Sequence, residues 1–200
     1  MHCTGVILAG GGATRFDGRP KGLEVVGGRR IIDRVADALR AVSDDLLLIA
    51  NDPGADAWLP GVRTCRDVRP GEGSLGGLHA ALSHAAGAVL VVAWDMPFVS
   101  APLLARLRAL GEEGHDAAVA ESLGRRGVEP VCAWYGPQAL DAIARALDRG
   151  DRRAIAFLDE VRVARLALAE VRRFGDPASL FLNVNTPEEL AEAIRRANAS

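Results

Sequence analysis

Short runs of apolar residues alternate along the chain with longer stretches in which apolar residues recur every three or four positions. A continuous apolar run is typical of a strand covered on both faces, and the longer period is typical of a helix with one buried face. The runs predict strands at 5–8, 46–50, 62–65, 88–93, 117–120, 131–135 and 163–168, and the stripes predict helices at 30–42, 75–85, 102–110, 137–147, 152–161 and 186–197.

This alternation predicts an α/β fold, a Rossmann-like three-layer sandwich with a mostly parallel central sheet. The chain of 200 residues is long enough for one well-buried domain and too short to expect two, and no repeat or low-complexity linker divides it. We therefore expect residues 1–200 to form a single domain. Hydrophobic residues make up 49% of the chain and charged residues 25%, which is ordinary for a soluble enzyme.

Charge and cysteine content exclude several classes of protein. The formal net charge of −2 argues against a nucleic-acid partner, which requires a basic face. No apolar stretch is long enough to cross a membrane, and the N-terminus lacks the layout of a signal peptide. Cys3, Cys65 and Cys132 are scattered, which favours reduced thiols over a disulfide framework or a metal cluster. We expect a cytoplasmic protein.

The most informative segment follows the first predicted strand. Residues 8–21 read LAGGGATRFDGRPK, a glycine-rich turn that contains Arg15 and ends at Lys21. Glycines let the backbone approach a ligand and present N–H groups to it, and the two cations can neutralise phosphate oxygens. A tight structural turn would explain the glycines, but not the ordered combination of strand, Leu-Ala-Gly-Gly, arginine and lysine. The segment therefore predicts a site for a nucleoside triphosphate.

Two better-known phosphate loops do not fit this segment. A P-loop needs a serine or threonine after its lysine, where this chain has Gly22, so no hydroxyl is present to hold magnesium. The dinucleotide fingerprint needs a third glycine where this chain has Arg15. We expect a phosphate loop of another type.

Polar residues follow four of the apolar segments. They are Asn51 after 46–50, Asp67 after 62–65, Asp95 after 88–93, and the pair Asn183 and Asn185 after the late segment 180–182. Turn chemistry alone explains any one of them, because Asn and Asp favour turns. Ligands gather at the carboxyl ends of parallel strands, so these positions together with the glycine-rich loop predict one site.

Asp95 is the strongest candidate for a metal ligand. Mg²⁺ takes one or two carboxylates together with substrate phosphates and waters, and a strand-terminal aspartate suits that role. The alternative role, a helix cap, is better filled by Ser100, which stands directly before the next predicted helix. Thr186 is likewise expected to cap the last helix, whereas Asn183 and Asn185 are spaced to point to the same side of an extended segment.

Residues 8–23 closely resemble the opening signature of the MobA-type nucleotidyltransferases, the molybdenum cofactor guanylyltransferases. Later segments are similar to family motifs as well: 73–77 (GSLGG), 94–98 (WDMPF), 129–131 (EPV, on the acceptor side) and 182–190 (LNVNTPEEL). Three positions depart from the family pattern. Pro20 replaces an acidic residue found in many members, Ser74 replaces a proline, and Trp94 replaces the common cysteine.

The resemblance implies transfer of GMP from GTP to the terminal phosphate of molybdopterin-bound molybdenum (Mo-molybdopterin), with pyrophosphate as the other product. It implies GTP binding by Leu8, Ala9, Gly10, Gly11, Lys21, Asn51, Asp67 and Asp95, Mg²⁺ as cofactor on Asp95, and acceptor binding by Asn183 and Asn185. Arg15, Lys21 and Asp95 are the expected catalytic residues. We also expect transient contact with other cofactor-biosynthesis proteins or apo-molybdoenzymes.

Three alternatives stay open at this point. A molybdopterin cytidylyltransferase has a similar loop, usually with Leu-Ala-Ala-Gly, so Gly10 and Gly11 favour guanine. Another small nucleotidyltransferase that joins an NTP to a phosphate, such as a sugar-1-phosphate enzyme, is chemically close but normally longer. A non-catalytic homologue that only binds the nucleotide or cofactor would keep the fold, although Arg15, Lys21 and Asp95 argue against it.

Overall fold

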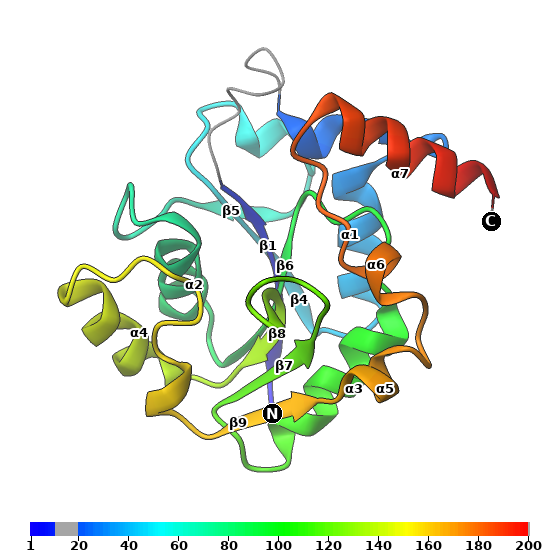
Figure 1. Ribbon diagram of the computed structural model, residues 1–200. Coiled ribbons are helices and arrows are strands. Elements are labelled where there is room, and N and C mark those ends of the chain that lie inside the picture. Colours follow the sequence, from blue (N-terminus) through cyan, green and yellow to red (C-terminus); the bar gives the residue numbers. More distant parts are fainter. Residues whose placement is uncertain (11–19, 200) are drawn as a thin grey trace.

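Figure 1 shows a computed structural model of the protein, which describes residues 1–10 and 20–199. A seven-stranded sheet forms its middle layer. Its strands are β1 (Cys3–Ala9), β4 (Asp45–Ala50), β5 (Arg63–Cys65), β6 (Ala88–Ala93), β7 (Ala117–Glu121), β8 (Val128–Tyr135) and β9 (Val163–Leu166). The strand order is β5-β4-β1-β6-β8-β7-β9. Only β8 runs antiparallel to its neighbours, so the predicted mostly parallel sheet is confirmed.

Helices cover both faces of this sheet. They are α1 (Ile31–Arg40), α2 (Gly73–His84), α3 (Ala101–Glu112), α4 (Ala139–Asp148), α5 (Leu168–Val171), α6 (Pro177–Leu180) and α7 (Pro187–Ala199). The helices α2 and α4 bury their apolar residues against one face, while α1, α3 and the three C-terminal helices lie on the other (Figure 1). These layers confirm the predicted three-layer sandwich. None of the helices in the described part is long and apolar enough to cross a membrane.

The pattern of apolar residues explains why these segments take these forms. Every residue of β1 is buried, as expected of a central strand with helices on both sides. In α1 the buried residues recur at helical spacing, and the polar residues face outward. Asp33 in its first turn and Arg40 in its last turn have the signs that stabilise the helix dipole. A short hairpin of β2 (Val25–Val26) and β3 (Arg29–Arg30) precedes α1 and contacts α7.

Strand direction brings several chain segments to one edge of the sheet. The strands β1, β4, β5 and β6 are parallel, so their carboxyl ends meet there. The strand β8 runs the other way, with Cys132 paired to Val92 of β6, so β8 begins where β6 ends. We call this end of the sheet, at which the parallel strands finish, the carboxyl edge.

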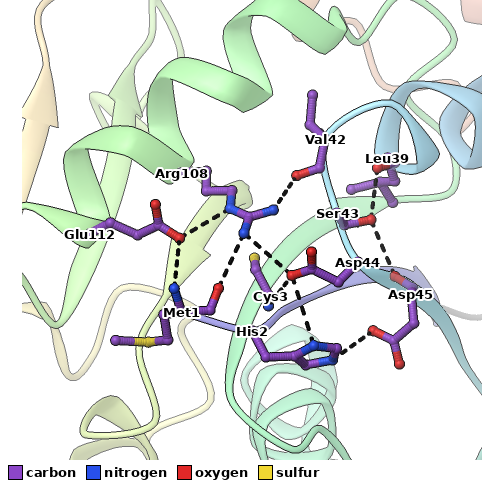
Figure 2. A network of polar contacts seen from close by, with 10 residues as sticks. All are labelled: Met1, His2, Cys3, Leu39, Val42, Ser43, Asp44, Asp45, Arg108 and Glu112. Carbon is purple, nitrogen blue, oxygen red and sulfur yellow. Dashed lines mark hydrogen bonds and ion pairs between the residues drawn. The ribbon is translucent and has the colours of Figure 1, made fainter.

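At the opposite end of the sheet, where the parallel strands begin, Arg108 of α3 joins the start of the chain to the start of β4 (Figure 2). It donates to the carbonyl of Val42 at 2.9 Å and to the carboxylates of Asp44 at 3.3 Å and Glu112 at 3.1 Å. The backbone N–H of Cys3 donates to the same Asp44 oxygen at 2.8 Å. These contacts fix the amino ends of β1 and β4.

The expected helix at 152–161 is wrong. The hydrogen bonds of this segment join residues three apart. The N–H of Ala156 donates to the carbonyl of Arg153 at 2.9 Å, and that of Leu158 donates to Ile155 at 3.2 Å. Only the short 3-10 helix η4 (Leu158–Glu160) forms there. The buried residues Ala154, Phe157 and Leu158 have the spacing typical of a helix, but the segment is a series of turns.

The apolar segment 180–182 is not a strand either. Leu180 ends α6, and the N–H of Leu182 donates to the carbonyl of Ser179 at 3.1 Å in a turn. The apolar side chains here fill the core beneath the C-terminal helices. A run of three apolar residues is too short to separate these two structures from the sequence alone.

Gly111 of α3 gives a test of core packing. A Cβ at this position would lie 2.1 Å from Cε3 of the buried Trp134. We expect Gly111→Ala to lower the free energy of unfolding by about 1–3 kcal/mol because it overpacks the core. Gly77→Ala in α2 is the control, since its Cβ would meet Leu8 at an ordinary 3.5 Å and alanine favours a helix by roughly 0.5–1 kcal/mol. Denaturant titration measures both, and equal destabilisation would contradict this account.

Candidate functional site

A cavity of about 650 Å³ opens at the carboxyl edge of the sheet. Nine of the predicted site residues line it: Leu8, Ala9, Gly10, Lys21, Asn51, Asp67, Asp95, Asn183 and Asn185. The predicted residues Gly11 and Arg15 lie outside the described residues. The first loop, the ends of three further strands and the segment before α7 therefore meet around one space, as the sequence predicts.

An ion pair between Lys21 and Asp95 stands at the centre of the site. Nζ of Lys21 lies 2.5 Å from Oδ2 of Asp95, and the two side chains are only 12% and 8% exposed. The second carboxylate oxygen, Oδ1 of Asp95, is buried and has no hydrogen-bond partner among the described residues. A buried carboxylate oxygen without a partner is costly, so Asp95 is suited to a further ligand.

The C-terminal segment reaches the same pair. Oδ1 of Asn185 accepts a hydrogen bond from Nζ of Lys21 at 2.6 Å, and the N–H of Val184 donates to the carbonyl of Asp95 at 2.9 Å. Glu189 accepts from the N–H of Asn185 at 2.7 Å, and its own N–H donates to Oγ1 of Thr186 at 3.2 Å. The expected cap by Thr186 is confirmed, and this cap fixes the backbone that carries Asn185.

The backbone around Lys21 is held from the other side by an indole ring. Lys21 begins the 3-10 helix η2 (Lys21–Leu23), which follows Pro20. A Cβ at Gly22 would lie 2.3 Å from Cε3 of Trp94, so only glycine allows this close approach. Trp94 also stacks on Trp58, with ring centroids 4.9 Å apart. The tryptophan that departs from the family pattern thus packs directly behind the lysine.

Asn51 and Asp67 form a second polar pair, at the ends of β4 and β5. Nδ2 of Asn51 donates to Oδ2 of Asp67 at 2.7 Å, and the N–H of Asp67 donates to Oδ1 of Asn51 at 3.0 Å. The reciprocal bonds fix the orientation of the Asn51 carboxamide. Both side chains line the cavity, where the Asp67 carboxylate can meet a ligand.

The amino end of α2 forms another wall of the cavity, through Gly73 and Ser74. The helix α2 begins at Gly73, so Ser74 lies inside its first turn. Gly71 and Gly73 have φ angles of 83° and 61°, which favour glycine. Free N–H groups at a helix start attract anions, and this polarity suits a phosphorylated ligand.

The turn before β8 and the start of that strand supply two further charged side chains. Glu129 and Arg126 both line the cavity. Burial raises the pKa of the Glu129 carboxyl, although a hydrogen bond from Ser122 and the charge of Arg126 act in the opposite direction. Sequence reasoning missed Arg126, because it lies in the turn before β8 and belongs to no motif.

The residues present suit a hard divalent cation. Asp95 offers a carboxylate oxygen without a partner, which is the kind of ligand that Mg²⁺ prefers. Residues 1–10 and 20–199 contain no group of three or more His, Cys, Asp or Glu side chains that could hold a metal ion by themselves. A cation on Asp95 would therefore need oxygen ligands from a substrate, as Mg²⁺ does in phosphate-transfer sites.

Comparison with known proteins agrees with this geometry. Residues 5–166 match the family described as the MobA-like NTP transferase domain. The chain is 34% identical over 195 residues to a molybdenum cofactor guanylyltransferase of Desulfosudis oleivorans, covering 95% of this chain and 93% of that protein. It is 38% identical over 196 residues to a probable molybdenum cofactor guanylyltransferase of Pelotomaculum thermopropionicum, covering 96% and 92%.

Solved structures show the same fold. Molybdopterin-guanine dinucleotide biosynthesis protein A from Archaeoglobus fulgidus has a TM-score of 0.83 at 28% identity, over 98% of this chain and 100% of that one. The manganese complex of Rv0371c from Mycobacterium tuberculosis has a TM-score of 0.66 at 21% identity, over 97% and 98%, and shows the fold alone. The family match covers most of the chain, and the similarity to the two relatives covers nearly its full length. The chain therefore belongs to the MobA-like NTP transferase family and is a nucleotidyltransferase.

Proposed function

We propose that the protein transfers GMP from GTP to the terminal phosphate of Mo-molybdopterin, giving the guanine dinucleotide form of the cofactor and pyrophosphate. The observation that carries this proposal is the buried Lys21–Asp95 pair beside the glycine-rich loop, with one carboxylate oxygen free for a cation. The names of the relatives support the choice of guanine and of molybdopterin.

We assign the nucleotide to the side of the cavity at the carboxyl ends of β1, β4 and β5. Loop N–H groups from Ala9 to Ala13, among them those of Gly10 and Gly11, would contact the triphosphate, and Leu8 would line the same side. Asn51 and Asp67, held by their reciprocal hydrogen bonds, would contact the nucleoside. The preformed pair lowers the entropy cost of binding because its side chains are already ordered.

Charge neutralisation is the main chemical task of this site. An anionic phosphate oxygen of the acceptor attacks the α-phosphorus in line, so no strong general base is needed. Lys21 and Arg15 would stabilise the negative charge on the triphosphate and on the leaving pyrophosphate. Asp95 would hold Mg²⁺, which when bound supplies further positive charge to the phosphate oxygens.

The acceptor is assigned to the opposite side of the cavity, where β8 begins. Asn183 and Asn185 line the cavity from the C-terminal segment, and Arg126 and Glu129 line it from the β7–β8 hairpin. The strand order places β8 next to β6, on the side of Asp95 away from β4 and β5. Two substrates can thus approach Asp95 from two sides, which the in-line reaction requires.

The remaining assignments follow from this function. We assign the activity to the cytoplasm, and its product would pass to other cofactor-biosynthesis proteins or apo-molybdoenzymes. The relatives named above are guanylyltransferases, so the cytidylyltransferase and the sugar-1-phosphate enzyme are not favoured. Family membership also argues against a protein that only binds the cofactor.

A panel of GTP, CTP, ATP and UTP, each with Mg²⁺ and Mo-molybdopterin, tests the proposal by pyrophosphate release. We expect GTP to be used at least tenfold better than the other nucleotides, a preference of about 1.4 kcal/mol or more. Asp95→Asn keeps the shape of the side chain but removes its charge, and should lower turnover by roughly a thousandfold. Near-normal turnover by Asp95→Asn would overturn the role of Asp95, and preference for CTP would overturn the choice of nucleotide.

The partly buried carboxyl of Glu129 predicts a pH effect on stability. Its pKa is raised in the folded state, so the folded protein binds this proton more tightly than the unfolded chain does. The stabilisation of the folded state by this proton is fully present at a pH below the pKa of Glu129 in the unfolded chain. It is lost as the pH rises through the raised pKa of the folded state. The free energy of unfolding of wild type minus that of Glu129→Gln should therefore increase as the pH falls from 7 to about 4.

Denaturant titration at a series of pH values measures this difference. Asp159→Asn is the matched control, because it removes one negative charge from an exposed position. A Glu129→Gln difference that stays constant with pH, or that changes in the opposite direction, would contradict the effect of burial on Glu129.

A further inference from the structure

We propose that Lys21 is the resident counter-cation of Asp95 and that Asn185 is the positioning residue that holds it. The metal ion would then enter the site together with the triphosphate and not before it. This inference rests on the proposed function, because it concerns how the same site is filled. It also gives Asn185 a role toward Lys21 in addition to its predicted contact with the acceptor.

The first support is the arrangement of donors and acceptors. The ammonium of Lys21 has three N–H donors and no acceptor. One donor goes to Oδ2 of Asp95 and another to Oδ1 of Asn185, at 2.5 Å and 2.6 Å. No third partner of Nζ lies within residues 1–10 and 20–199, and Lys21 itself lines the cavity. Lys21 is therefore bound on two sides and can still meet a ligand.

The second support is the balance of charge. Asp95 carries one negative charge, and Lys21 already neutralises it in a poorly exposed position. A free divalent ion at Asp95 would meet the Lys21 ammonium at close range, where the low exposure keeps the repulsion strong. The other charged groups that line the cavity, Asp67, Glu129 and Arg126, make no ion pair with Lys21 in the described part of the chain. A triphosphate brings the negative charge that both cations need.

The third support is that the backbone around Lys21 is fixed, while the long stem of a lysine side chain has several rotatable bonds. The backbone of Lys21 is held because Gly22 packs on Trp94. Asn185 is held by the bond of its N–H to Glu189 and by the neighbouring bond from Val184 to Asp95. The four-carbon stem of lysine can change rotamer within this frame. Its ammonium can thus move from Oδ2 of Asp95 to a phosphate oxygen and keep its bond to Asn185.

Mn²⁺ binding without nucleotide tests the counter-cation role. Free Mn²⁺ is measured by its EPR signal during titration of the full chain. We expect Lys21→Met to bind Mn²⁺ at least about tenfold more tightly than wild type, because both oxygens of Asp95 become available. Asp95→Asn in the Lys21→Met background should remove the gain. An unchanged Mn²⁺ affinity in Lys21→Met would overturn the proposal, and Lys21→Gln provides the same test should the Met variant fold poorly.

GTP affinity in the presence of Mn²⁺ tests the positioning role of Asn185 through a double-mutant cycle. Lys21→Met and Asn185→Ala should each weaken GTP binding by about tenfold, and the double variant should be little worse than Lys21→Met alone, because Asn185 acts through Lys21. Asn183→Ala is the matched control: its side chain lines the same cavity but donates to the carbonyl of Phe181 at 2.9 Å.

The effects of Asn183→Ala and Lys21→Met on GTP affinity should multiply, since the two side chains do not share a contact. Effects of Asn185→Ala and Lys21→Met that also multiply would overturn the positioning role. Failure of wild type to bind GTP at all would instead count against the proposed function. The two failures are therefore distinguishable in the same titrations.

Discussion

The ion pair between Lys21 and Asp95 is the interaction on which the site depends. It joins a lysine from the first loop to an aspartate at the end of β6, and Asn185 adds a partner from the C-terminal segment, 164 residues from Lys21 in sequence. Removing one member of a buried ion pair commonly costs about 3–5 kcal/mol, because the other charge is left without a partner. In the proposed function the same two charges also bind the cation and the phosphate groups, which would explain why a costly buried pair is present.

The topology of the sheet explains why these residues meet. Six strands of the sheet run parallel and end at the carboxyl edge, and β8, the antiparallel strand of the sheet, begins there. The proposed nucleotide and acceptor sides then lie on either side of β6, with Asp95 between them. The C-terminal segment after the family match, which ends at residue 166, completes the site through Asn185 and Val184. The cavity is thus lined by residues from almost the whole length of the chain.

Much of the fold and of the site was predictable from local sequence. The strands, the parallel sheet, and the positions of Lys21 and Asp95 follow from apolar runs and from the residues that end them. The turns at 152–161 were not predictable, because their buried residues have helical spacing while their hydrogen bonds do not. The bond from Asn185 to Lys21 and the packing of Trp94 on Gly22 depend on tertiary structure, for which a single sequence gives no local signal.

The most direct test of the central claim is a crystal structure with Mn²⁺ and a non-hydrolysable GTP analogue, in which anomalous scattering locates the metal. This account predicts Mn²⁺ bound to the carboxylate of Asp95 and to phosphate oxygens, with Nζ of Lys21 moved from Asp95 to the triphosphate. A metal bound away from Asp95, or Lys21 still paired with Asp95 while the triphosphate lies elsewhere, would contradict it.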